Sequence, residues 1–134
     1  MKAREFISKP ASLNQSVDGG SLEGYVVDSD QPQLTNYLSG QGANPDVISA
    51  IKNKYKRIGI IRNMYVDEDN RGQGTGNNLV SNAIDTAAEL GAQAIILVSD
   101  IHETNVMDLT KWYKGFGFEQ VGTASGDPVM ILEL

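Results

Sequence analysis

A glycine-rich run, Arg71-Gly72-Gln73-Gly74-Thr75-Gly76, is the segment whose composition and spacing best suit ligand chemistry. It lies between a predicted strand and a predicted helix, where free N–H groups of the first helical turn and the helix dipole attract an anion such as phosphate. Glycines let a ligand approach the backbone closely, because no Cβ intervenes. The spacing disfavours two other phosphate loops. No lysine follows Gly76, as a P-loop requires, and the third glycine of a dinucleotide fingerprint would fall on Asn77.

Several kinds of site are excluded by the residues that the chain lacks. It has no cysteine, which rules out disulfides, thiolate metal sites and a cysteine nucleophile. His102 is the single histidine, so a multi-histidine metal site is excluded and we expect no metal. A Ser-His-Asp triad could be built on that histidine alone.

The elements around the glycine-rich run predict a βαβ unit. Residues 58–66 alternate as a strand does, and residues 79–90 carry apolar side chains at helical spacing before a C-cap at Gly91. The continuous apolar run 94–98 is typical of a strand buried on both faces. The two strands should therefore be parallel, joined by a right-handed crossover. A short helix ending near Gly115 and two closing strands, at 118–121 and 129–134, complete the second half.

The first half is predicted to hold one strand and two helices. Residues 1–20 are polar and indicate a turn or a loose N-terminal arm. A strand is expected at 21–28, followed by a helix that enters at Gln31-Pro32. A second helix should begin at Asn44-Pro45, an N-cap followed by proline at the first helical position.

Two motifs together resemble the GNAT superfamily of N-acetyltransferases. The run 71–76 matches Arg/Gln-x-x-Gly-x-Gly/Ala, the acyl-CoA pyrophosphate loop of that family, in its setting after a strand and an acidic turn. About forty residues on, the segment 112–119 is similar to the family's Tyr-x-x-x-Gly-Phe. The resemblance covers about residues 58–134. It implies an α/β (α+β) fold with a mixed, mostly antiparallel central sheet, a parallel βαβ acyl-CoA-binding unit and flanking helices.

The N-terminal part departs from the family pattern. The family runs strand, two helices and a two-strand hairpin before the loop strand. Here the two predicted helices lead almost directly into Ile58, so we expect the hairpin to be reduced or displaced.

The resemblance implies acetyl-CoA as co-substrate and assigns residues to hold it. The amides from Gln73 to Asn77, with the Arg71 side chain, would hold the pyrophosphate, and the backbone of residues 64–66 would pair with the pantetheine arm. Asn105 resembles a common asparagine of the family. The cofactor-binding residues expected on this basis are Met64, Tyr65, Val66, Arg71, Gly72, Gln73, Gly74, Thr75, Gly76, Asn77 and Asn105.

The resemblance also implies direct transfer of an acetyl group to an amine. Tyr113 would protonate or hydrogen-bond the leaving thiolate as the general acid, while Trp112 is expected to be a core residue. A base for the amine is not singled out: Glu68 and His102 are both candidates, beside Asn63, Tyr65, Asp67 and Glu103. A lysine-like amine with a pKa of about 10.4 is neutral in roughly one molecule in 2,500 at pH 7, which costs about 4.6 kcal/mol.

Size and charge limit the partners. The 134 residues fit one domain spanning the whole chain. Residues 61–134 carry eleven Asp and Glu against four Lys and Arg, which disfavours nucleic-acid binding and favours a cationic amine acceptor.

No apolar segment is long enough to span a membrane, so we expect a cytoplasmic protein without membrane contact. We expect it to be a monomer or a homodimer. Residues 2–7 also resemble the start of some bacteriophage-encoded proteins.

Two other functions remain open from the sequence. The same fold could bind acyl-CoA or a protein partner without turnover. A βαβ nucleotide-binding domain is disfavoured by the spacing of the glycines. The acceptor could be a polyamine, an aminoglycoside, a protein N-terminus, a lysine on a protein or the amine of a charged tRNA.

Overall fold

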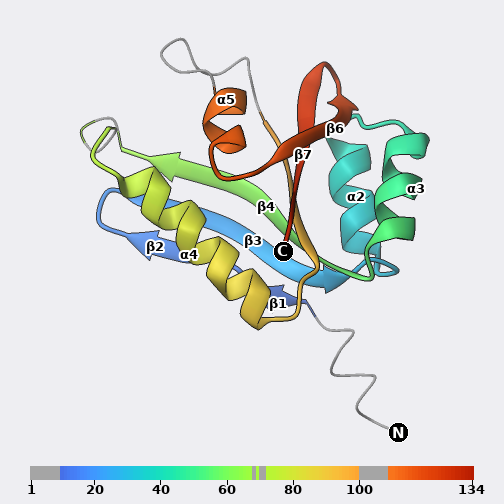
Figure 1. Ribbon diagram of the computed structural model, residues 1–134, viewed down its shortest axis with the longest axis horizontal. Helices are drawn as coiled ribbons and strands as arrows, with labels where there is room; N and C mark the ends of the chain where they lie inside the picture. Colours follow the sequence, from blue (N-terminus) through green and yellow to red (C-terminus); the bar gives the residue numbers. More distant parts are fainter. Residues whose placement is uncertain (1–9, 68, 70–71, 100–108) are drawn as a thin grey trace, which may run out of the picture.

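The computed structural model describes residues 10–67, 69, 72–99 and 109–134, which form one twisted sheet between two layers of helices (Figure 1). The strand order is β1-β3-β4-β5-β7-β6, with β2 also paired to β3. The described strands are β1 (Ala11–Ser12), β2 (Gln15–Val17), β3 (Gly20–Asp28), β4 (Arg57–Val66), β5 (Ala94–Val98), β6 (Glu119–Ala124) and β7 (Asp127–Glu133). The β4–β5 pair is parallel and the other described pairs are antiparallel, which confirms the predicted mixed sheet.

Helices cover both faces of the sheet. On one face lie α4 (Thr75–Glu89) and α5 (Leu109–Lys114), and on the other lie α2 (Pro32–Gly40) and α3 (Pro45–Lys54) (Figure 1). Each face has its own cluster of buried side chains, which we call the α4-side core and the α2-side core. In the described part of the chain, no helix is long and apolar enough to cross a lipid bilayer.

Local signals define the ends of these helices as the sequence predicts. The Asn44 side chain accepts a hydrogen bond from the Val47 amide at 3.1 Å, and Pro45 occupies the first helical turn of α3. At the end of α4, Gly91 adopts a left-handed φ of 84°, and the Ala92 amide donates to the Ala87 carbonyl at 3.0 Å. Both arrangements satisfy backbone groups that a helix end otherwise leaves without partners.

The expectation of a loose N-terminal arm is wrong for the described residues 10–20. The short strands β1 and β2 pair with β3, and Leu13 between them is fully buried against the α4-side core. Burial of the apolar Leu13 side chain stabilises the packing of this otherwise polar segment against the sheet. The expected hairpin is thus displaced: β1, β2 and β3 precede α2 and α3, rather than following them. Residues 1–9 lie outside the described part.

The C-terminal hairpin is tighter than predicted. Residues 122–128 were expected to be a loop, but Ala124 pairs with Asp127 and only Ser125 and Gly126 make the turn. Both turn residues have positive φ, 51° and 88°, as a two-residue hairpin turn with the twist of the sheet requires. Serine is not a residue type that favours positive φ, so the sequence pattern predicts a longer loop than the structure has.

The parallel strands β4 and β5 separate partway along their length. They pair at Ile58, Gly59 and Ile60 of β4, and the pairing ends there. Immediately beyond, β4 has a β-bulge, because Gly24 and Glu23 of β3 face Ile61 and Asn63 and leave Arg62 unmatched. A Cβ on Gly24 would overlap the Ile60 carbonyl oxygen, so the bulge needs a glycine opposite it. The carboxyl ends of β4 and β5 are therefore not paired with each other, and we call this unpaired region the opening.

Candidate functional site

The helix α4 begins directly after the loop that follows β4, and its N-cap residue provides no side-chain cap. Gly74 is the N-cap with a left-handed φ of 84°, and among the described residues no side chain accepts from the first turn, in contrast to Asn44 at α3. The first bond within the helix runs from the Asn78 amide to the Gly74 carbonyl at 3.0 Å. The amides of Thr75, Gly76 and Asn77 therefore have no acceptor inside the helix, and the positive end of the dipole adds to their attraction for an anion.

The glycines of this loop leave space beside the backbone. Gly72 and Gly74 both have positive φ, and a Cβ on either would meet no described atom within 4 Å. Such a loop can accept a bulky anion against its backbone. Arg71, which was expected to add charge here, lies outside the described residues.

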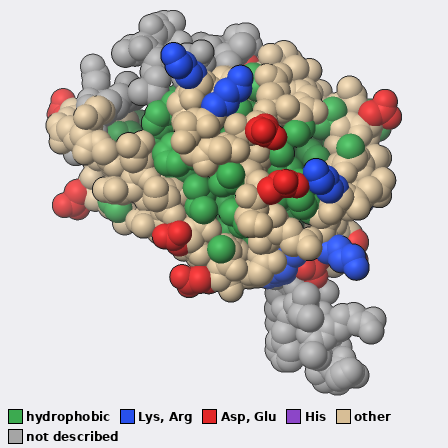
Figure 2. Space-filling view, in the orientation of Figure 1, with side chains coloured by type: hydrophobic (Ala, Val, Ile, Leu, Met, Phe, Trp, Pro, Cys, Tyr) green, Lys and Arg blue, Asp and Glu red, His purple; other side chains and the backbone are tan. Residues whose placement is uncertain are grey.

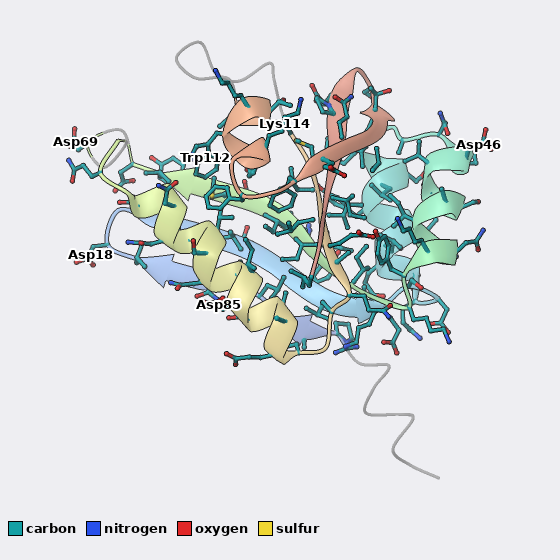
Figure 3. The ribbon with its side chains drawn as sticks, in the orientation of Figure 1. Asp18, Asp46, Asp69, Asp85, Trp112 and Lys114 are labelled. Carbon is teal, nitrogen blue, oxygen red and sulfur yellow. The ribbon has the colours of Figure 1, made fainter. Side chains whose placement is uncertain are left out.

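Trp112 fixes α5 against this end of α4 (Figure 3). Its indole Nε1 donates to the Asn77 side-chain oxygen at 3.1 Å, and a Cβ on Gly76 would lie 3.3 Å from its ring. Its ring also packs edge-on against Phe116 at a centroid distance of 5.0 Å. The sequence assigned Trp112 to the core. The structure shows it half-buried, joining the loop to the helix that carries Tyr113.

Tyr113, a residue of α5, is buried in the α4-side core with 7% of its surface exposed. Its ring packs edge-on against Phe118 at 5.7 Å. Burial, and to a lesser degree the charge of Tyr37, raises the pKa of Tyr113 to about 12. The phenol therefore keeps its proton at neutral pH and is available as a donor.

The far half of β4 presents a strand edge to the opening. Met64 and Val66 are half-buried against the α4-side core, while Tyr65 between them is 55% exposed on the other face. On one side, residues 64–66 pair with residues 20–22 of β3. On the other side, β5 has already ended its pairing at Ile96, so no described strand faces Met64 and Tyr65.

Tyr37 is a site residue that the sequence did not single out. Its hydroxyl donates to the Ile61 carbonyl at 3.3 Å and accepts from the Val98 amide at 3.1 Å, bridging β4 and β5 where they separate. In the sequence it is one of three apolar or aromatic residues at helical spacing, with Leu34 and Leu38. No sequence signal showed where its hydroxyl would lie.

Five of the expected or candidate site residues lie outside the described residues: Glu68, Arg71, His102, Glu103 and Asn105. Among the described residues, the exposed Glu23 carboxylate of β3 accepts from Asn63 Nδ2 of β4 at 3.4 Å. Glu23 was not considered in the sequence, since its partner comes from across the β-bulge. In the described ranges, no group of three acidic or histidine side chains could hold a metal ion.

The described surface has a hollow that does not lie at this opening. It has a volume of about 340 Å³ and lies between α3 and the β6–β7 hairpin, lined among others by Lys54, Tyr55 and Glu133. Glu133 pairs with Ala94, the first residue of β5, so the hollow lies at the opposite end of that strand. Two of its charged side chains, Lys54 and Glu133, are exposed and pair with each other, with Lys54 Nζ 3.2 Å from Glu133. We therefore place the site at the opening, where backbone donors and acceptors are arranged for a ligand.

The raised pKa of Tyr113 predicts a loss of stability at alkaline pH. An unfolded tyrosine ionises near pH 10, whereas folded Tyr113 holds its proton to about pH 12. Between these values the unfolded chain has lost more protons, so its free energy of unfolding falls as pH rises, by roughly 2 to 3 kcal/mol in full. Below about pH 10, this tyrosine contributes no pH dependence. Denaturant unfolding on both sides of that pH should show a smaller alkaline loss for Tyr113→Phe, and equal losses in the two proteins would contradict the assignment.

Comparison with known proteins agrees with this geometry. Residues 25–120 match the family described as "Acetyltransferase (GNAT) domain". The chain therefore belongs to the GNAT acetyltransferase family, as its two motifs indicated. No curated protein matches the chain.

Solved structures share the fold at low sequence identity. A polyamine N-acetyltransferase of Drosophila melanogaster is 15% identical with a TM-score of 0.56, covering 86% of this chain and 69% of that one. A GNAT-family acetyltransferase of Listeria monocytogenes is 16% identical with a TM-score of 0.58, covering 87% and 58%. The NatC complex bound to Gag peptide and CoA is 18% identical with a TM-score of 0.57, covering 87% and 61%. This chain is thus shorter than the proteins it resembles, and the likeness shows the fold.

Proposed function

We propose that this chain, as a single domain, transfers an acetyl group from acetyl-CoA to an amine. The observation that carries the proposal is one arrangement at the carboxyl ends of β4 and β5. Met64 and Tyr65 have no described strand beside them on the side of β5, and the N-terminus of α4 follows β4 with amides that no carbonyl of the helix accepts. Trp112 connects this N-terminus to α5, the helix that carries Tyr113.

The residues fit coenzyme A along its length. The amides of Gln73 to Asn77 supply donors for the pyrophosphate, with Gly72 and Gly74 leaving room for it. The backbone of Met64, Tyr65 and Val66 offers the pantetheine arm a strand edge, as an added strand would use it. Arg71 and Asn105 complete the expected set.

Tyr113 would meet the thiolate that leaves as the amide forms. The amine lone pair attacks the thioester carbonyl carbon, the C–S bond breaks, and the thiolate leaves with the electron pair. Because burial raises the pKa of Tyr113 to about 12, the phenol is protonated at neutral pH and can stabilise the developing thiolate by hydrogen bonding. The proton that the amine releases restores the thiol. Glu68 and His102 stay the candidate bases for that release.

A cationic acceptor fits the charges near the opening. Acidic side chains gather at the end of the molecule where β4 leads into the loop, among them Asp18 and Asp69 (Figures 2 and 3). Asp67 lies at the same end, its amide bonded to the Gly19 carbonyl at 2.7 Å. This field would attract an ammonium group before it loses its proton.

We expect the acceptor's kcat/KM to fall as salt rises toward physiological strength, because screening shortens the reach of these charges to about 8 Å. Asp67→Lys should lower that constant, while Asp85→Lys on the exposed face of α4 should not. Steady-state rates at several salt concentrations test this. A preferred acceptor that is neutral or acidic, or rates that do not change with salt, would leave the acidic balance as a solubility feature.

The activity itself is tested by following free thiol from acetyl-CoA while candidate amines are added. The same mixtures, made with isotopically labelled acetyl-CoA and cell extract, identify the acceptor by mass spectrometry. Amine-dependent thiol release with a labelled amide product supports the transferase. Saturable acetyl-CoA binding without any amine-dependent release would instead support the non-catalytic acyl-CoA-binding module.

A further inference from the structure

Tyr37 occupies the place where the parallel ladder of β4 and β5 ends. Ile60 and Ile96 form its last pair. The hydroxyl bonds Ile61, the next residue of β4, and Val98, the last residue of β5. A single side chain from α2 thus joins backbone groups of two neighbouring strands.

The hydroxyl acts as a spacer between these strands. A direct ladder bond would bring an amide nitrogen and a carbonyl oxygen to about 2.9 Å. Here the hydroxyl lies 3.1 Å from the Val98 nitrogen and 3.3 Å from the Ile61 oxygen, so two hydrogen bonds span the gap in series. Both backbone groups are satisfied while the strands remain apart, whereas an unfilled gap would leave them without partners.

The surrounding structure holds Tyr37 in this position. Leu34 and Leu38, on the same helix, are fully buried in the α2-side core. Burial raises the pKa of Tyr37, and the hydrogen bond from the Val98 amide acts in the opposite direction. The hydroxyl is therefore protonated at neutral pH and can donate to Ile61 continuously.

Tyr37 and Tyr113 lie on opposite faces of the sheet, Tyr37 packed with the α2-side core and Tyr113 with the α4-side core. The two phenols are close enough that ionisation of Tyr37 contributes to the raised pKa of Tyr113. Tyr113 is assigned to the leaving thiolate. Tyr37 lies at the inner end of the opening, where the pairing of β4 and β5 stops.

We propose that Tyr37 is a positioning residue that selects a short acyl group: its hydroxyl keeps β4 and β5 apart, and its ring closes the inner end of the opening. This rests on the proposed function, since it assumes that a thioester enters there. A longer acyl chain would have to displace the ring. Discrimination of this kind is worth about 10- to 200-fold per methylene in an apolar pocket.

The test compares two Tyr37 variants by calorimetric binding of acetyl-CoA and butyryl-CoA and by hydrogen exchange of the Val98 amide. Tyr37→Leu removes the hydroxyl and most of the ring, so the affinity ratio should shift at least about tenfold toward butyryl-CoA. Tyr37→Phe keeps the ring and should retain the preference for acetyl-CoA, while the Val98 amide exchanges about tenfold faster. Tyr55→Phe, which loses a hydroxyl bond to Glu133 at the other end of the sheet, is the control and should change neither.

The outcomes separate this inference from the proposed function. A wild-type ratio in a folded Tyr37→Leu that still binds acetyl-CoA overturns the acyl selection alone. Unchanged Val98 exchange in Tyr37→Phe overturns the spacer role, even if Tyr37→Leu does not fold. A wild-type protein that binds neither thioester overturns the proposed function and the acyl selection with it.

Discussion

Tyr113→Phe is expected to lower kcat by roughly 10²- to 10³-fold, with the affinity for acetyl-CoA nearly unchanged. The change keeps the ring and its packing on Phe118 but removes the hydroxyl that would meet the developing thiolate. Loss of one preorganised donor to a developing anion typically has an effect of this size. Steady-state rates with the identified amine, together with calorimetric binding of acetyl-CoA, measure the two quantities separately.

The pH profile distinguishes a hydrogen-bond donor from a proton donor with an ordinary pKa. Because burial raises the pKa of Tyr113 to about 12, its ionisation should not limit the rate until the pH is well above 10. Tyr55→Phe is the control for loss of a hydroxyl elsewhere and should retain the wild-type rate. A Tyr113→Phe enzyme with most of its activity would return this residue to a packing role.

Gly74→Val should weaken acetyl-CoA binding at least tenfold, about 1.4 kcal/mol. The branched side chain would occupy the open space beside the loop backbone, where the pyrophosphate is proposed to lie. A valine with positive φ is also strained by roughly 1 to 2 kcal/mol, which lowers the free energy of unfolding by itself. The affinity must therefore be compared with a variant that has the same strain at another place.

Gly91→Val provides that control. Gly91 has the same φ of 84° as Gly74 but lies at the other end of α4. Both variants should lose a similar amount of unfolding free energy, and only Gly74→Val should lose affinity. Equal affinities in the two folded variants would show that the loop does not hold the pyrophosphate.

The second half of the chain was predictable because its signals are local and strong. The apolar run at 94–98 and the amphipathic helix that ends at Gly91 before it define a parallel βαβ unit, and the structure confirms it. The Asn44-Pro45 start of α3 is equally local, since a side-chain cap is satisfied within three residues. These elements need little information from distant parts of the chain.

The features missed depend on contacts between distant residues. β1 and β2 are too short for an alternating pattern, and they form because β3 offers an edge to pair with. The bulge at Arg62 follows from the register between β3 and β4, which no single segment encodes. Tyr37 likewise acquires its role from two strands that separate at Ile61 and Val98, which are 24 and 61 residues away along the chain. A helical periodicity identifies its face but not the backbone groups that its hydroxyl meets.

We propose that acetyl-CoA binds along the edge of β4 with its phosphates at the N-terminus of α4. This placement can be measured by titrating the isotopically labelled protein with acetyl-CoA and following the NMR signals of its backbone amides. Saturable shifts should be largest for the amides of Gly72 to Asn77 and Met64 to Val66. Shifts centred instead on the hollow around Lys54 and Glu133, or no saturable shift at all, would show that acetyl-CoA does not bind there.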